Sequence, residues 1–448
     1  MPTRRQFNQQ LAALATGLGL IGCSNVNKHV KRTPKKGTKS TIYRSVSGSP
    51  QENVAKTLEL MGGVEHLFGR DDVIAIKPNC QQWNQGSPNL AAVEAFVDAI
   101  MNRTGGFSGD IVFVENNHRG SKPWEYAGWK KGFERNSDID GVYNYTELSN
   151  SLKKRYGDQF AVVHWIDVDG GSKKVTKPED GPGYVMCDGK NGVPLLKMGN
   201  NREGELFREV IMSYPVFKTG RGAIVDYKHG VWENGKFSER EFKYINCAAL
   251  NHHSEYCGPT SAVKNYFGVV DLSGGPDPHN GGIMTDNYYN FHSFPFDKWA
   301  KGPTPGMMGR EVGMFLRTIR NPFLNFVTAE YIGVVDRIDP PVARTKCVLM
   351  SPDPVAMDYH TAKYILYPNS GIKKHNPDFK SGPFYADLKG CADESGMTLD
   401  EAFVDIKSYD HKARKLQNDD ELVVRGEIDW SFTKKTFVKY LLFRSGLA

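Results

Sequence analysis

The stretch that decides the fold is Asp72-Val-Ile-Ala-Ile-Lys77-Pro-Asn79, a short run of β-branched residues that stops at a proline. Such a run predicts a buried strand, and the polar side chains of Lys77 and Asn79 then fall at its carboxyl end. The pattern returns in Asp110-Ile-Val-Phe-Val-Glu115, and residues 89–100 between the two runs have apolar residues at helical spacing. Strand, helix and strand at this spacing predict a β-α-β unit with parallel strands.

The polar residues that follow these two strands are expected to lie together. The carboxyl ends of neighbouring parallel strands meet at one edge of a sheet, so Lys77 and Asn79 are expected beside Glu115 and His118. Open α/β sheets bind their ligands outside this edge. The sequence therefore places the functional site there.

Further segments extend the α/β pattern on both sides of this unit. Residues 51–67 and the stretch from Asp353 to about Tyr367 predict helices, the second with a proline in its first turn. Strand-like runs lie at residues 161–168, 208–216, 241–250, 329–336 and 345–350. We predict an α/β fold with mostly parallel sheets and flanking helices, with two lobes around a central cleft, over residues 51–410. Residues 411–448 are expected to pack on it as a C-terminal extension, and the topology of residues 120–240 stays open.

Four blocks of the chain together resemble the bacterial and archaeal family called domain of unknown function 362. They are the strand that ends at Asn79, the strand that ends at Glu115, residues 245–268, and Ser351-Pro-Asp-Pro-Val-Ala-Met-Asp-Tyr-His360. The positions that match the motifs of that family are His253, Lys264, Asn265, Phe267, Gly268, Asp353 and Asp358. Asn251 and Ser261 stand where the family pattern has a lysine and a glycine. The family has no settled reaction, so the resemblance implies a fold and a site position.

One group of candidate residues suits the binding of an anion or acid–base catalysis. A lysine beside amide side chains can bind a carboxylate or phosphate or stabilise an oxyanion, and a strand-end glutamate can act as a general base. The candidate catalytic residues are Lys77, Asn79, Glu115, Lys264 and Asn265. A strand-end ion pair is the structural alternative for Glu115, and a capping or solvent-facing lysine is the alternative for Lys264.

A second group of candidates suits a transition metal. Imidazole and carboxylate ligands that converge from several strand ends can hold Zn, Fe or Cu. The candidate metal ligands are His118, His252, His253, Asp358 and His360. No HxH or HxxxH spacing strengthens this hypothesis. Surface histidines and a helix-capping Asp358 are the structural alternatives.

The N-terminus has the layout of an export signal. Arg4 and Arg5 precede an apolar run over residues 11–21, and Gly22-Cys23 follows. The run is shorter than the roughly 20 apolar residues that cross a bilayer. The arginine pair resembles a twin-arginine signal, and Leu20-Ile-Gly-Cys23 resembles a lipobox, so residues 1–22 are predicted to be cleaved and Cys23 lipidated.

The predicted destination follows from this signal. Residues 23–50 are basic and poor in apolar groups, which predicts a flexible tether. We expect an exported protein on the periplasmic or outer face of a bacterial membrane, attached by its lipid anchor only. The expected partners are the twin-arginine translocase, the lipoprotein-processing machinery and a small anionic ligand.

Composition narrows the possible functions. The chain has 448 residues and a formal net charge of +6. Nine basic and no acidic residues lie in residues 1–50, which leaves 48 basic and 51 acidic residues in the remainder. The body therefore has no excess of positive charge for nucleic acid to bind. Apart from Cys23 the six cysteines form no CxxC, which excludes a contiguous iron–sulfur motif and leaves any disulfide pairing open.

Two functional hypotheses remain. The first is a metal- or cofactor-dependent enzyme, for example an oxidoreductase, that acts on a small anionic substrate. The twin-arginine route favours it, because this route carries proteins that fold around a cofactor before export. The alternative is a non-catalytic accessory lipoprotein that binds a ligand or a metal. Convergence of histidines and carboxylates in the fold would favour the enzyme, whereas converging lysines with separated histidines would favour ligand binding.

Overall fold

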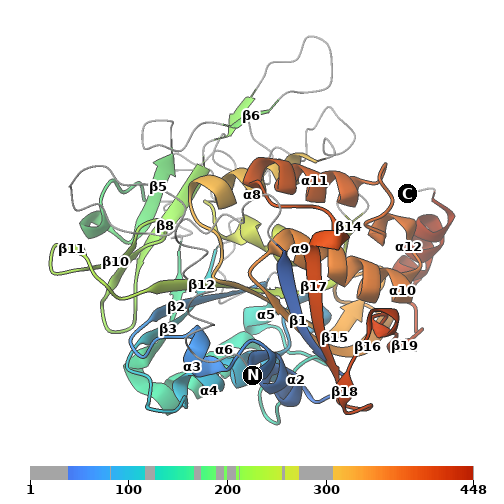
Figure 1. Cartoon of the computed structure of the whole chain (residues 1–448), viewed down its shortest axis with the longest axis horizontal. Coiled ribbons are helices and arrows are strands. Elements are labelled where there is room, and N and C mark those ends of the chain that lie inside the picture. The colour runs from blue at the N-terminus through green and yellow to red at the C-terminus, as the bar shows by residue number, and fades with distance from the viewer. Residues whose placement is uncertain are drawn as a thin grey trace. The chain divides into compact units, whose positions relative to one another are not determined.

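A large mixed, largely parallel sheet forms the centre of the fold (Figure 1). The computed structural model describes residues 39–80, 82–116, 127–165, 173–187, 196–198, 208–210, 212–254, 258–271 and 306–446. In spatial order the strands of the large sheet are β18 (Lys415–Leu416), β17 (Val404–Asp410), β1 (Ser40–Val46), β16 (Val342–Ser351), β15 (Leu324–Gly333), β12 (Phe242–Ala249), β2 (Val73–Pro78), β3 (Asp110–Glu115) and β4 (Phe160–His164). β19 (Glu427–Asp429) pairs with β16 off this path.

The predicted β-α-β unit is confirmed in β2, α4 (Leu90–Met101) and β3. The two strands are parallel, with Val73 opposite Asp110 and Ile76 opposite Phe113. α4 begins after Asn89, whose side chain accepts a hydrogen bond from the backbone N–H of Ala92. β12 lies parallel to β2 on its other side, and β4 lies parallel to β3. The carboxyl ends of four neighbouring strands therefore meet at one edge.

Alternating side chains of β2 and β3 fill two separate cores. Ile74, Ile76 and Phe113 pack on one face against α2 (Pro50–Leu60), α4 and α6 (Tyr145–Tyr156). Val73 and Val112 pack on the other face, in a core that also contains α8 (Met307–Thr318) and α11 (Pro383–Ser395). Figure 1 shows α2, α4 and α6 below the sheet and α8 and α11 above it. Lys77 continues the series of Val73 and Ala75, and so it emerges on the α8 side.

The segment whose topology the sequence leaves open contributes a second, antiparallel sheet. In spatial order its strands are β11 (Lys236–Phe237), β10 (Gly230–Glu233), β9 (Ile224–Asp226), β8 (Met212–Lys218) and β5 (Gly183–Cys187). Val185, Val216 and Val225 of this sheet share one apolar core with Val73 and Val112 of the large sheet. The predicted strand over residues 208–216 is divided between β7 (Arg208–Val210) and β8.

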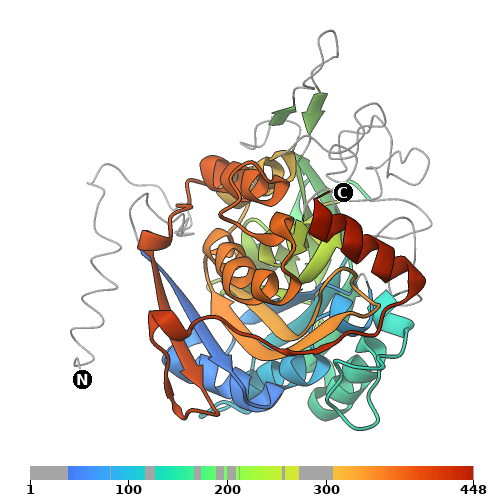
Figure 2. The ribbon, with the colours of Figure 1, turned by 90° about the vertical axis from the view of Figure 1, so that its right-hand side faces the viewer.

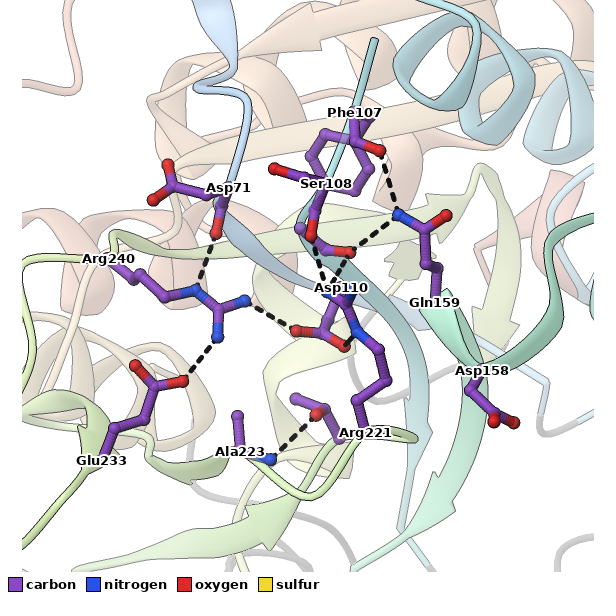
Figure 3. Close-up of polar contacts among 12 residues, drawn as sticks. Asp71, Phe107, Ser108, Asp110, Asp158, Gln159, Arg221, Ala223, Glu233 and Arg240 are labelled. Carbon is purple, nitrogen blue, oxygen red and sulfur yellow. Dashed lines mark hydrogen bonds and ion pairs between the residues drawn. The ribbon is translucent and has the colours of Figure 1, made fainter.

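Ion pairs around the buried Asp110 join the two sheets at the amino ends of the strands (Figure 3). Asp110, at the start of β3, accepts hydrogen bonds from Arg221 Nε at 2.8 Å and from Arg240 Nη2 at 2.6 Å. Arg240 also donates to Glu233 Oε1 at 2.6 Å and to the carbonyl of Asp71 at 2.9 Å. Burial by itself would raise the pKa of Asp110, but the two guanidinium groups hold this pKa below its ordinary value. At the amino edge of the large sheet, these charged groups are thus bonded to one another and hold the two sheets together.

Two predicted boundaries near the N-terminus are wrong. The tether was expected to reach residue 50, but Ser40–Val46 is β1, in the interior of the large sheet, with Ile42 fully buried. The predicted helix over residues 51–67 is divided into α2 and α3 (Val64–Leu67). Gly62 and Gly63 separate these helices with φ of +101° and +91°, values that L side chains rarely adopt. Residues 1–38, which include the predicted signal and Cys23, lie outside the described residues.

The C-terminal third explains why the large sheet is mixed. β15 and β16 are the strands predicted at residues 329–336 and 345–350, but they run antiparallel. β1 is antiparallel to β16 and parallel to β17. The predicted helix after Asp353 consists of α9 (Pro354–Thr361), a π-helical turn and α10 (Tyr367–Ser370). Residues from 411 onward supply β18, β19 and α12 (Lys434–Ser445), the dark red helix of Figure 2.

Candidate functional site

The candidate site is built around Lys77, at the carboxyl end of β2. The side chain is 2% exposed. Its Nζ donates to Asn265 Oδ1 at 2.7 Å and to the carbonyl of Pro78 at 3.3 Å, and it lies 3.3 Å from Glu115 Oε1. An ammonium group has three protons, so each has a partner here. The predicted meeting of Lys77 and Glu115 at one edge of the sheet is thus confirmed.

Glu115 is held by backbone donors as well as by Lys77. Its Oε2 accepts from the N–H of Cys80 at 3.1 Å, and its Oε1 accepts from the N–H of Asn116 at 3.2 Å. Burial raises the pKa of Glu115, while the charge of Lys77 and the two N–H groups act in the opposite direction. A buried pair of this kind costs desolvation energy that apolar residues would not cost. It is therefore a candidate for function rather than for stability alone.

A row of polar side chains continues from Lys77 across the sheet. Lys77, Asn246 and Asn325 are directly opposite one another on β2, β12 and β15. Asn246 Nδ2 donates to Asn325 Oδ1 at 2.8 Å, and Asn325 Nδ2 donates to the carbonyl of Ser351 at 2.9 Å. Asn265 Nδ2 donates to Asn246 Oδ1 at 2.9 Å. Asn246 and Asn325 were not identified from the sequence. The one feature that sets them apart in the sequence is that each is an amide residue within an otherwise apolar strand pattern.

Helix α7 (Ala262–Asn265) carries Asn265 to this row. Asp358 fixes the start of α7, because its two carboxylate oxygens accept the N–H of Ala262 at 2.6 Å and of Val263 at 3.0 Å. Asp358 is 2% exposed. The capping role that was the structural alternative for Asp358 is the one these contacts describe.

Gly268 lies against the charged pair. A Cβ atom there would lie 2.5 Å from Lys77 Nζ and 3.2 Å from Glu115 Oε1. The backbone at Gly268 therefore covers the pair so closely that a side chain at this position would force the end of the Lys77 side chain to move. This contact accounts for the glycine that ends the segment Lys264-Asn-Tyr-Phe-Gly268.

Asn116 has a side-chain oxygen that accepts no hydrogen bond from the described residues. The residue is 4% exposed, and its Nδ2 donates to the carbonyl of Val270. Its Oδ1 is buried without a hydrogen-bond partner among the described residues. Buried acceptors are almost always paired, so this oxygen needs a donor from outside the described residues, such as a water molecule or a ligand. Asn79, also predicted here, is partly exposed directly after β2.

Lys264 is not brought to Lys77. Its Nζ lies 3.5 Å from Met308 Sδ and 4.6 Å from the centre of the Phe267 ring, on the α8 side of α7. The charge of Lys264 acts there on two buried carboxyl groups, Glu311 of α8 and Asp387 of α11. The two candidate lysines therefore have different carboxylate neighbours.

The described histidines have separate partners. His252 Nδ1 lies 2.8 Å from His375 Nε2, and His253 Nδ1 lies 2.7 Å from Thr260 Oγ1. His360 Nε2 lies 3.2 Å from Arg44 Nη1 and must accept this hydrogen bond, because a guanidinium only donates. Within the described ranges no group of three or more His, Cys, Asp or Glu residues is placed to hold a metal. His118 lies outside these ranges.

Four of the described cysteines are free thiols. Cys80, Cys247, Cys347 and Cys391 are free and buried. Burial, and then the charge of Glu115, raises the pKa of Cys80 well above its ordinary value, so its thiol is held in the neutral form although Lys77 acts in the opposite direction. The contribution of Cys80 to the site is its backbone N–H.

Comparison with family models, with curated proteins and with solved structures found no match to this chain. The resemblance to the domain of unknown function 362 family therefore stays a prediction.

Proposed function

We propose that the carboxyl edge of β2, β3 and β12 binds a small polar molecule, and that the protein is an enzyme whose acid–base group is Glu115. One observation carries the proposal: a carboxylate with a raised pKa is fixed by Lys77 and two backbone N–H groups, and it lies next to Asn116 Oδ1, which has no partner among the described residues. A raised pKa makes a carboxylate a stronger base than an ordinary surface glutamate.

The other residues of the site then have distinct roles. Lys77 is a positioning residue, because its three protons are used within the protein. Asn265 holds Lys77 and ties it to the polar row of β12. Asn116 Oδ1 would accept a hydrogen bond from a substrate hydroxyl or amino group, and Glu115 would take a proton from a neighbouring atom of the same molecule.

This chemistry favours a substrate that donates hydrogen bonds. An anionic substrate remains the prediction from the two lysines, but the described contacts give it less support. Lys77 is paired with Glu115, and Lys264 lies by the carboxyl groups of Glu311 and Asp387. Lys77 is therefore not left uncompensated to attract an anion to this edge.

The metal- or cofactor-dependent version has weaker support. His252, His253 and His360 are each bonded to a different neighbour. These residues do not fit one metal ion, and we derive no step through a metal. The separation of the histidines favours the second candidate function, a protein that binds its ligand at the same edge without turnover.

The proposal includes the location of the protein. We infer export by the twin-arginine route and attachment through a lipid on Cys23, on the strength of the sequence from Arg4 to Cys23. No helix in the described part of the chain is long and apolar enough to cross a membrane. The two predicted lobes would be the large sheet and the five-stranded sheet, with the ligand at the edge that carries Glu115.

The site is tested by a thermal-shift screen of the wild type, Glu115→Gln and Glu59→Gln. The panel consists of sugars, hydroxy acids, amino acids and nucleosides, and each compound that binds is followed for conversion by mass spectrometry. Glu59 is an exposed carboxylate on α2 and serves as the matched control. We expect compounds that stabilise the wild type and the control but not Glu115→Gln, and turnover that only this variant loses. Equal binding and turnover by all three proteins would contradict the proposal, and binding without conversion would favour the non-catalytic candidate.

A further inference from the structure

Helix α12 carries apolar side chains on two sides. Phe443 is 5% exposed and packs with Val334, Val335 and Ile372. On the outer side Phe437 is 48% exposed, Val438 55%, Leu441 51% and Leu442 39%. A helix that is apolar all round is normally covered all round. The outer side of α12 therefore lacks a covering partner among the described residues.

The exposed apolar groups of the described chain gather in this segment. Trp430, just before the helix, is 47% exposed, and its ring lies 5.7 Å from that of Tyr440. Five of the eight large hydrophobic side chains that are exposed in the described residues lie between Trp430 and Leu442. Figure 2 shows α12 on the right-hand outside of the ribbon. A contiguous patch of this kind marks an interaction surface.

All the charges of this segment are positive. From Trp430 to the end of the sequence there are four basic residues and no Asp or Glu. Lys434, Lys435 and Arg444 are exposed at the ends of α12. Lys435 and Lys439 lie 3.4 and 3.0 Å from Asp336, which anchors the inner side of the helix. A second copy of this face would bring like charges together, whereas an anionic surface would complement them.

We propose that α12 and Trp430 form an interfacial segment that lies in the headgroup region of a bilayer with anionic lipids. α12 has 12 residues and is about 18 Å long, too short for the ~30 Å hydrocarbon core, so it lies in the plane of the membrane. The outer apolar side chains enter the interface, and the exposed Lys434 and Arg444 add attraction to anionic lipid. This inference stands apart from the proposed site and from the proposed lipid on Cys23, and it modifies the expectation of attachment by a lipid only.

The test uses the mature chain from residue 23 with Cys23→Ser, so that no lipid is present. Its co-sedimentation is measured with vesicles of phosphatidylethanolamine and phosphatidylglycerol, and with phosphatidylcholine vesicles. We expect binding to the anionic vesicles that weakens in salt and on phosphatidylcholine. Phe437→Ser/Leu441→Ser should lower the partition constant about tenfold or more.

Leu416→Ser is the matched control, because Leu416 is 60% exposed on β18, far from α12 in Figure 1. It should bind vesicles as the parent does. Circular dichroism checks that all variants are folded. We expect them to fold, because the substituted side chains are exposed. Equal binding by the patch variant and the control would overturn the proposal. So would a parent that ignores vesicles but forms dimers that Phe437→Ser/Leu441→Ser dissociates.

Discussion

Gly268 permits the contact between Lys77 and Glu115, because a methyl group at this position would overlap the ammonium. In Gly268→Ala the Lys77 side chain must move and give up its bonds to Asn265 and Glu115. We expect the free energy of unfolding to fall by about 2–4 kcal/mol, since a buried carboxylate loses its counter-charge. Urea denaturation measures this change.

Gly132→Ala is the control for that variant. A Cβ at Gly132 meets no atom within 4 Å, so the substitution should leave stability unchanged or slightly higher. Gly268→Ala should also raise the pKa of Glu115 further, which infrared titration of the carboxyl band detects. If the two alanine variants are equally stable, Gly268 does not enclose the pair as described.

Glu311 is a buried carboxyl group that the proposed mechanism does not use. It is fully buried on α8, and neither oxygen has a hydrogen-bond partner in the described part of the chain. Burial, and then the nearby charge of Asp387, raises the pKa of Glu311 well above its ordinary value. A raised carboxyl pKa means that the folded state binds more protons than the unfolded state. Binding of this extra proton therefore stabilises the folded state fully at a pH below the pKa of Glu311 in the unfolded chain. This stabilisation is lost as the pH rises through the pKa of Glu311 in the folded protein.

Glu311→Gln should therefore stabilise the protein in a pH-dependent way. At about pH 8 we expect a gain on the order of 1–3 kcal/mol in unfolding free energy, and at about pH 4 little difference. Unfolding by urea at both pH values gives the comparison. The exposed Glu59→Gln should show no such trend, and the same gain at both pH values would refute the linkage.

At the scale of elements, α8 and α11 approach each other through glycines. A Cβ at Gly313 of α8 would lie 2.5 Å from the carbonyl oxygen of Cys391 and 2.8 Å from Glu394 Cβ. Alanine ordinarily stabilises a helix interior by about 1 kcal/mol relative to glycine. Here we expect Gly313→Ala to destabilise the protein by about 2–4 kcal/mol, because backbone atoms cannot move aside in a close-packed interface.

This prediction is tested by whether Gly313→Ala lowers or raises the free energy of unfolding. Chemical denaturation should show a loss of stability for Gly313→Ala, whereas Gly132→Ala shows none. A gain for Gly313→Ala would mean that helix propensity outweighs the helix contact. In that case the two helices are less closely packed than the glycine positions indicate.

Elements with local signals were predictable from the sequence, and pairings between distant segments were not. β2, α4 and β3 follow from alternation, helical spacing and the capping residue Asn89. β1 has a largely polar composition, and it is a central strand because it pairs with two distant segments, β16, where Tyr43 is opposite Met350, and β17. The same holds for the site: Lys77 and Glu115 end neighbouring strands, whereas the contact of His252 with His375 spans 123 residues.

At the scale of the whole molecule, the two edges of the large sheet differ in their chemistry. At the amino edge Asp110 is saturated by Arg221 and Arg240, which join the two sheets. At the carboxyl edge the pair of Lys77 and Glu115 adjoins an acceptor on Asn116 that has no partner in the described part of the chain. The charged groups that join the sheets at the amino edge are thus paired with one another, whereas the carboxyl edge has an acceptor that a ligand can use. Open α/β sheets generally bind their ligands at the carboxyl edge.

The proposed attachment to the membrane concerns the molecule as a whole. The formal net charge of +6 comes from the N-terminal 50 residues, ahead of a slightly acidic body. If Cys23 is lipidated, the wild type should enter the detergent phase on detergent phase separation and incorporate labelled palmitate. Cys23→Ser should do neither, because covalent acyl chains give an attachment that a surface helix cannot match.

The two modes of attachment separate in a salt wash of isolated membranes. Wild-type protein should stay bound in high salt, whereas Cys23→Ser should be released, since its remaining hold through α12 depends on anionic headgroups. Cys23→Ser combined with Leu441→Ser should already be released in low salt. Retention of Cys23→Ser in the detergent phase would show that Cys23 is not the anchor, whatever α12 contributes.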